Sequence, residues 1–411
     1  MGEEGEGRVL PPRVRWGRLE PWRQNLYVLW FGSLVVSLSF SLVMPFLPLY
    51  LVEELGLKTD PSLWSGIVLA GAFLGTAVMS PVWGALADRF GQRAMLLRSG
   101  FSLAFIYVAM GLSATPLQLA IWRVLFGAMS GFIPAATALV ASNTPTPYLG
   151  IALGSLSTGT AAGGVLGPLF GGAVAQWLGY RGAFYAAGFG LLLGAILAFF
   201  LVGERVPPFR GSSWRRFLPE LWELFQRPSL RESYILIFFQ QTAMMVAAPV
   251  LPLIIADHAP HASSLLVGLI YALAGVAQVM GGPVTARLAG RTGYRRLLTF
   301  SFLATAFLML PQASSSLALL GGSRFIFGFP LVWGTVALTY LVTRAAPEGQ
   351  RGQVFGLVNS INSLASMAGS LVGGLLGHVL GWNAAIYGSA LLFLVGALLS
   401  WQFTRTGSLR E

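Results

Sequence analysis

The sequence predicts an all-α integral membrane protein, with twelve transmembrane helices in two parallel six-helix bundles. Composition is the first reason, because 55% of the 411 residues are hydrophobic and only 10% are charged. Apolar runs of bilayer-spanning length, about 20 residues, also follow one another with short interruptions. The third reason is a pair of matched halves. Together these features exclude an ordinary soluble globular protein.

The spans are placed by hydropathy and length. They lie at 25–51, 63–87, 94–113, 116–142, 150–178, 181–203, 232–256, 264–289, 297–313, 317–343, 353–379 and 382–404. The N-terminal bundle is then 25–203 and the C-terminal bundle 232–404. Residues 1–24 and 405–411 are tails, and the arginine-rich segment 204–231 is the linker.

A charged turn reveals the internal repeat. The stretch Gly84–Arg93 recurs in eroded form at Ala286–Arg295, 202 positions later. Further pairs at offsets of 201 to 204 are Pro45 and Pro249, Arg123 and Arg324, Gly171 and Gly373, and Gly179 and Gly381. Six spans per copy keep both copies in the same orientation, so the repeats are parallel.

Basic residues predict the orientation in the membrane, since Lys and Arg concentrate on the cytoplasmic side. By position, 22 of the 26 lie in the tails, the linker and the turns of one face. Both termini are therefore expected in the cytoplasm, with the protein in a prokaryotic plasma (inner) membrane and no removable signal peptide. This topology explains the net charge of +11 without a nucleic-acid partner, which would require a separate basic domain.

The sequence offers no sign of a cofactor or a catalytic site. A phosphate-binding loop needs Gly-Lys, and Lys58, the only lysine, follows Leu57. The glycine-rich runs lie inside predicted helices, so they do not form a dinucleotide site, and no residues have metal-ligand spacing. We expect neither a cofactor, a metal ion nor enzymatic activity.

With these motifs in view, the chain resembles the major facilitator superfamily. Gly84–Arg93 is similar to the motif between helices 2 and 3, and Arg123–Gly127 to the conserved-arginine motif of helix 4. Gly163–Gly172 is similar to the helix-5 antiporter motif. Together with Ser41–Pro48 in helix 1, these stretches resemble the twelve-helix drug:proton antiporter branch. The resemblance implies the major facilitator fold and a secondary transporter that exports amphipathic drugs or toxic compounds by alternating access, in exchange for protons. The solute pathway is then expected between the two halves.

The loop motif suggests a cytoplasmic latch that holds the outward-facing state. A carboxylate at Asp88 is well placed to rest against the positive end of a helix, and the resemblance puts the start of span 11 nearby. The latch residues are Gly84, Asp88, Arg89, Gly91, Arg93 and Arg351. The alternative is an ordinary solvated loop that only fixes topology.

The helix-5 motif places small residues on one helix face. Glycines four residues apart permit close approach of another helix, and proline favours a bend. The motif residues are Gly163, Gly167, Pro168, Gly171 and Gly172. A seam that pivots during transport and plain helix packing both require these residues, so both interpretations remain open.

An arginine inside a span costs about 2.5–3.5 kcal/mol on insertion scales and normally faces a cavity or a partner. Arg123 is therefore a candidate for substrate binding or proton coupling, the alternative being a structural arginine bonded to backbone carbonyls. We expect the substrate cavity to be lined by Arg123, Gln240, Gln241, Asn359, Asn362, Met44, Trp30 and Met244.

No acidic residue lies in the middle of a predicted span, which departs from many members of the family. Candidates for proton coupling are Asp88, Glu53, Glu54, Asp257 and His378. Without a buried negative charge, neutral, zwitterionic or anionic amphiphiles fit better than a dedicated cation. A lipid flippase, or an uptake carrier for an organic anion or small solute, is the alternative function. We expect a monomer, since one chain contains both halves.

Overall fold

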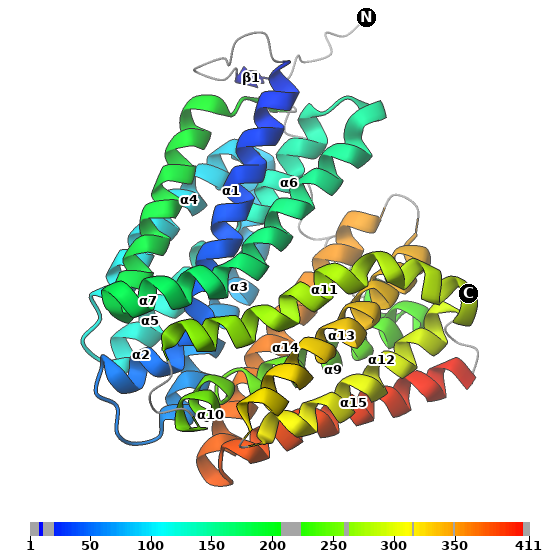
Figure 1. The fold of residues 1–411 in the computed structure, drawn as a ribbon. Helices are drawn as coiled ribbons and strands as arrows, with labels where there is room; N and C mark the ends of the chain where they lie inside the picture. Colours follow the sequence, from blue (N-terminus) through cyan, green and yellow to red (C-terminus); the bar gives the residue numbers. More distant parts are fainter. Residues whose placement is uncertain are drawn as a thin grey trace, which may run out of the picture. The chain divides into compact units, whose positions relative to one another are not determined.

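The computed structural model describes residues 8–10, 20–206, 223–258, 263–314, 316–347 and 350–405, nearly all of them helical (Figure 1). The elements of the N-terminal half are β1 (Arg8–Leu10), α1 (Pro21–Val43), η1 (Met44–Phe46), α2 (Leu47–Glu53), α3 (Pro61–Phe90), α4 (Gln92–Gly111), α5 (Pro116–Met129), α6 (Phe132–Asn143), η2 (Thr146–Tyr148), α7 (Leu149–Leu201) and β2 (Glu204–Val206). Those of the C-terminal half are α9 (Pro228–Ala247), α10 (Leu251–His258), α11 (Ser264–Thr292), α12 (Tyr294–Met309), η3 (Leu310–Ala313), α13 (Leu317–Ala345), α14 (Arg351–Val379) and α15 (Trp382–Arg405).

Eleven helical segments of the described chain are long and apolar enough to cross a membrane. One of them, Thr146–Leu201, has 56 residues, which corresponds to roughly 84 Å of helix, against a hydrocarbon thickness of about 30 Å. It includes Gly179 at φ 71° and ψ 173°, where the helical conformation is interrupted. This segment therefore supplies two spans, which gives the twelve that the sequence predicts, within a few residues at each end.

The chain divides into two compact units, residues 1–46 with 75–211 and residues 47–74 with 212–411. The division differs from the predicted bundles because α2 and the first half of α3 group with the second unit. A small-residue contact explains the grouping of α3, since a Cβ added at Gly66 would lie 2.9 Å from the Cα atom of Gly374 on α14. The bundle limits 25–203 and 232–404 remain predictions.

In the first unit, α1 packs along the glycine face of α7. A Cβ at Gly163 would lie 2.7 Å from the backbone nitrogen of Leu38, and one at Gly167 would lie 2.5 Å from the Cβ of Ser41. Only glycine allows the two backbones to approach this closely. At the β2 end of these helices, the apolar core is formed by α1, α4, α6 and α7, with Leu29, Leu96, Phe132, Ala136, Leu139, Leu156 and Ala198 among its buried residues.

In the second unit, α9 packs on α14 in the corresponding way. A Cβ at Gly369 would lie 2.8 Å from the Cβ of Met245, and one at Gly373 would lie 2.8 Å from the Cα of Val246. The glycines that begin or break helices also match between the halves. Gly91 and Gly293 have φ of 91° and 80°, and Gly179 and Gly381 have φ of 71° and 89°. The repeat in the sequence is thus also a repeat in local structure.

The fourth span is broken in its middle, which the sequence analysis does not anticipate. α5 ends at Met129 and α6 begins at Phe132, with Gly131 between them at φ 139°. The break leaves backbone groups without helical partners, and such groups must be satisfied within the protein at membrane depth. Arg98 on α4 does this, because its Nη2 donates a hydrogen bond to the carbonyl oxygen of Ser130 at 3.2 Å.

A short antiparallel sheet ties the N-terminal segment to the end of the sixth span. In its register, Arg8 lies opposite Val206 and Leu10 opposite Glu204. Beside it, the buried Asn25 side chain both donates to the carbonyl of Gly203, at 2.8 Å, and accepts from its N–H, at 2.9 Å. Residues 204–206 of the predicted linker therefore belong to the first unit, whereas 207–222 lie outside the described residues.

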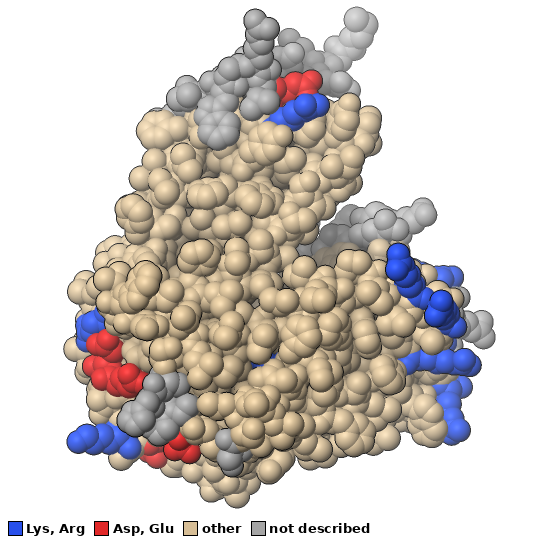
Figure 2. All heavy atoms as spheres, in the orientation of Figure 1, with Lys and Arg blue, Asp and Glu red and all other residues tan. Residues whose placement is uncertain are grey.

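The surface agrees with a lipid environment. On the face shown in Figure 2, charged side chains gather near the ends of the helices, and the surface between them is almost entirely uncharged. Large apolar side chains such as Phe105, Phe189 and Leu391 are 60% or more exposed. An apolar exterior this extensive is suited to hydrocarbon rather than to water.

The glycine packing of the first unit can be tested with two neighbouring residues. We expect Gly163→Ala to destabilise the protein by about 1–3 kcal/mol, because the added methyl group overlaps the α1 backbone. Gly164→Ala is the matched control, since the nearest atom to its Cβ would be 3.7 Å away. The measurement is the thermal unfolding temperature of the purified protein in detergent. Equal unfolding temperatures for the two variants would contradict the packing described.

Candidate functional site

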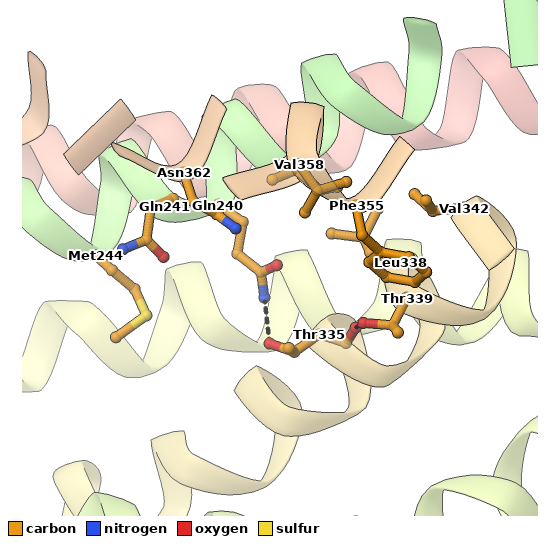
Figure 3. Close-up of a pocket in the computed structure, with 11 residues that line it drawn as sticks. Gln240, Gln241, Met244, Thr335, Leu338, Thr339, Val342, Phe355, Val358 and Asn362 are labelled. Atoms are coloured by element: carbon orange, nitrogen blue, oxygen red, sulfur yellow. Dashed lines mark hydrogen bonds between the residues drawn. The ribbon is translucent and has the colours of Figure 1, made fainter. Parts of the chain in front are cut away.

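A pocket within the second unit gathers polar side chains from three spans. It has a volume of about 150 Å³ and is lined by α9, α13 and α14 (Figure 3). Its polar members are Gln240, Gln241, Thr335, Thr339 and Asn362, and its apolar members are Ile237, Met244, Leu338, Val342, Phe355 and Val358. None of these lining residues is charged.

The pocket lies inside its spans, away from their ends. Gln241 on α9, Thr335 on α13 and Asn362 on α14 are each about ten residues from the same end of their spans, which corresponds to roughly 15 Å of helix. The spans are 27 to 29 residues long, so the pocket lies nearer to that end than to the other. Polar groups inside membrane spans mark this pocket as a candidate functional site.

Half of the predicted cavity residues line this pocket, namely Gln240, Gln241, Met244 and Asn362. Asn359 lies one turn before Asn362 on α14 but is exposed and does not line it. The other three belong to the first unit. Trp30 Nε1 donates to Thr158 Oγ1 at 3.0 Å, and Met44 begins the short helix η1. Their role in a substrate cavity stays a prediction.

Arg123 is enclosed inside the first unit, with a side chain that is 1% exposed. Its guanidinium carbon lies 5.2 Å from the centre of the Phe126 ring, while Nε and Nη2 have no hydrogen-bond partner among the described residues. Tyr107 packs against the same ring and donates its hydroxyl proton to the carbonyl of Ser39 at 3.0 Å. Arg123 does not line the pocket of the second unit, and its predicted part in binding or coupling stays a prediction.

Thr335 and Thr339 line the pocket from α13 but are not among the cavity residues predicted from the sequence. A signal for them exists, because Thr335, Thr339 and Thr343 recur every four residues in the second half of a mostly apolar helix. Such spacing places all three on one helix face. Polar residues on a single face of a span indicate a surface that does not contact lipid.

A second pocket lies at the other end of the second unit, among α2, α10 and the start of α3 and α15. It has a volume of about 440 Å³ and brings together Glu53, Lys58, Asp257 and Trp382. Two of the predicted proton-coupling residues, Glu53 and Asp257, thus line one cavity. Glu54 follows Glu53 directly at the end of α2.

His378, a third coupling candidate, forms an ion pair near this end of α14. Its Nδ1 lies 2.9 Å from Oδ1 of Asp60, and the side chains are 39% and 45% exposed. Asp60 precedes α3 and is the only described non-glycine residue with positive φ, at 57°. The pairing carries charge on both partners only while the imidazole is protonated.

The loop motif is explained in part. Gly91 has φ of 91°, and a Cβ there would lie 2.6 Å from Oε2 of Glu204. The Glu204 carboxylate is buried and accepts hydrogen bonds from the N–H groups of Gln92, at 2.6 Å, and Arg93, at 3.0 Å. It therefore caps the start of α4, where a negative charge also favours the helix dipole. The sequence analysis does not identify Glu204.

The remaining latch residues do not form a described cluster. Arg93 Nη2 donates to the carbonyl of Phe199 at 2.7 Å, Arg89 is exposed beside the ring of Phe90, and Gly84 has open space around it. The side chains of Asp88 and Arg351 lie outside the described residues. The latch stays a prediction.

The helix-5 motif forms a packing surface. Gly163, Gly167 and Gly171 face α1, while Pro168 and Gly172 are buried in the same helix. The geometry provides the close seam that both interpretations require, and it does not separate a static contact from a pivot.

Comparison with known proteins decides the family. The sequence matches the Major Facilitator Superfamily over residues 29–232 and 233–410. The chain belongs to the major facilitator superfamily. Among curated members, it is 33% identical to the "Multidrug resistance protein MdtG" of Proteus mirabilis over 398 residues, covering 95% of this chain and 98% of the relative. The protein of the same name from Dickeya zeae is 34% identical over 402 residues, covering 95% and 97%.

Solved structures show the same fold. A nucleoside transporter, NupG, superimposes with a TM-score of 0.75 at 13% identity, covering 93% of this chain and 98% of that one. A D-xylose-proton symporter gives a TM-score of 0.73 at 19% identity, covering 93% and 97%. This chain is thus a membrane transporter with the major facilitator fold, embedded in the inner membrane and acting on small molecules. It is not an enzyme.

Removal of the Glu204 carboxylate is expected to destabilise the protein at the start of α4. We expect Glu204→Ala to cost about 1–3 kcal/mol, because it leaves two N–H groups at the start of α4 without their charged acceptor. Glu223→Ala is the control, since that carboxylate is exposed and contacts only Arg227 one turn away. Hydrogen exchange of the α4 amides should increase in the first variant only. Unchanged protection at Gln92 and Arg93 would show that the cap is not needed.

Proposed function

We propose that this transporter exports amphipathic drugs or toxic compounds, and that the pocket lined by α9, α13 and α14 forms part of its substrate site. The observation that carries the proposal is the lining of this pocket, in which five uncharged polar side chains face Met244, Phe355 and aliphatic residues. Apolar walls with a few polar groups are typical of drug-sized binding sites. Adaptable Met and aromatic side chains favour broad specificity.

The curated relatives support the same function. Their names describe multidrug resistance, and the similarity extends over almost the whole length of both chains. The pocket volume of about 150 Å³ is below the roughly 300 Å³ at which drug-sized sites begin. These residues therefore hold one portion of a substrate rather than enclosing it completely.

We further propose that export is coupled to protons and that one chain is the working unit, with both termini in the cytoplasm. Resemblance to drug:proton antiporters supports the coupling, and the distribution of basic residues supports the orientation. The candidate carriers remain Asp88, Glu53, Glu54, Asp257 and His378.

The direct test measures efflux of a fluorescent amphiphile from preloaded bacteria that express the chain. We expect rapid efflux that stops when a protonophore collapses the proton gradient. Efflux that continues without the gradient would contradict proton coupling but not drug export. Substrate accumulation by expressing cells would favour an uptake carrier, and transfer of labelled lipid between leaflets by the reconstituted protein would favour a flippase.

The pocket itself is tested by removing its amides. We expect Gln240→Leu and Gln241→Leu each to reduce the efflux rate at least about threefold, since each loses a hydrogen bond worth about 0.5–1.5 kcal/mol. Gln278→Leu is the matched control, because Gln278 on α11 bonds only to the carbonyl of Ala274 in its own helix. Expression and unfolding temperature are measured for all three. Equal efflux by the pocket variants and the control would exclude this pocket from the substrate pathway.

A further inference from the structure

The pocket uses about half of its own hydrogen-bond donors internally. Gln240 Nε2 donates to the carbonyl oxygen of Leu331, at 3.4 Å, and to Thr335 Oγ1, at 3.2 Å. Figure 3 draws the second of these bonds. The two acceptors are hydrogen-bonded to each other at 3.0 Å, so they lie on the same side of the amide nitrogen and occupy at least one of its two protons. The Leu331 oxygen can only accept, which fixes the orientation of the Gln240 amide.

The two threonine hydroxyl groups of the pocket also use their protons within the protein. Thr335 Oγ1 donates to the carbonyl of Leu331 at 3.0 Å, and Thr339 Oγ1 donates to the carbonyl of Thr335 at 2.8 Å. A hydroxyl has a single proton, and in both residues it is directed to the backbone of α13. Only the oxygen lone pairs of these threonines remain for a ligand.

Gln241 is held in place by a third hydroxyl. Its Nε2 donates to Ser366 Oγ at 2.9 Å, and Ser366 Oγ in turn donates to the carbonyl of Asn362 at 2.7 Å. Because the Ser366 proton is committed to a carbonyl, Ser366 must accept from Gln241. The Gln241 amide is thereby oriented with its nitrogen toward α14.

The groups left for a ligand are therefore mainly acceptors. They are Oε1 of Gln240, Oε1 of Gln241, Oδ1 of Asn362 and the Oγ1 atoms of the two threonines, and no donor from a described residue pairs with either Oε1. The donors left are at most one Nε2 proton of Gln240, the second Nε2 proton of Gln241 and the two amide protons of Asn362. No lining residue carries a charge.

We infer that this site, taken as the substrate site proposed above, selects uncharged amphiphiles that carry hydrogen-bond donors, such as phenols, alcohols and secondary amides. A donor group satisfies acceptors that would otherwise lose their water without replacement, which costs about 1–3 kcal/mol for each group. A permanent cation gains no opposite charge here and gives up its hydration. A ligand that can only accept leaves the two glutamine oxygens unpaired.

The inference is tested with three probes that share one apolar ring system, namely naphthol, its methyl ether and a naphthyl trimethylammonium ion. Binding to the purified full-length protein is measured by equilibrium dialysis at a fixed detergent concentration. We expect naphthol to bind about 3- to 10-fold more tightly than the ether, the ratio that one hydrogen bond provides. The trimethylammonium ion should bind more weakly than naphthol.

Variants then assign the selectivity to the acceptors. Gln240→Met and Gln241→Met keep the side-chain length and remove the oxygens, so the naphthol-to-ether ratio should fall toward one. Gln278→Met is the control and should keep the ratio of the unaltered protein. Gln241→Glu adds a carboxylate and should strengthen binding of the trimethylammonium ion severalfold.

The outcomes separate this inference from the proposed function. Equal binding of naphthol and its ether, or a ratio that survives both methionine substitutions, overturns the selectivity for donors. If fluorescent amphiphiles are still exported in a pocket-dependent manner, the proposed function stands. If none of the probes binds and the pocket variants export normally, both proposals are overturned.

Discussion

The structure depends on one constraint, that a backbone polar group inside a bilayer must find a partner within the protein or line a cavity. The broken fourth span meets it through Arg98, whose guanidinium bonds to the carbonyl of Ser130 and lies 3.4 Å from the centre of the Trp83 ring. In the pocket, Thr335 and Thr339 meet it by returning their protons to α13. The second solution has a chemical consequence, because each satisfied hydroxyl still offers an oxygen lone pair. Because the threonine protons bond to backbone carbonyls of α13, these hydroxyl groups face the pocket as hydrogen-bond acceptors.

The fold could be predicted from sequence because its signals are long and repeated. Apolar runs define the spans, and the matched glycines Gly91 and Gly293 recur at the same point of each half with positive φ. The break between α5 and α6 could not be placed, since it depends on Arg98, which lies more than 30 residues earlier in the chain. The assignment of the first half of α3 to the second unit likewise depends on the contact of Gly66 with Gly374, which local sequence does not encode.

The candidate site could be predicted only in part, for a related reason. Gln240 and Gln241 stand out because two adjacent amides are rare in an apolar helix, and both line the pocket. Arg123 stands out as strongly, yet it is enclosed against Phe126 and Tyr107 in the first unit. Whether a polar residue in a span faces a cavity or the interior of its own bundle depends on neighbouring helices. Glu204 was missed because it lies at a helix end, where a carboxylate is unremarkable until its two N–H partners are known.

The sheet between β1 and β2 has a consequence for biosynthesis. Its first strand leaves the ribosome before the described spans, and its second only after the sixth span has been translated. The first strand must therefore wait for almost two hundred residues of chain before its backbone can find this partner. The sheet can form only once the first half of the chain has been synthesised.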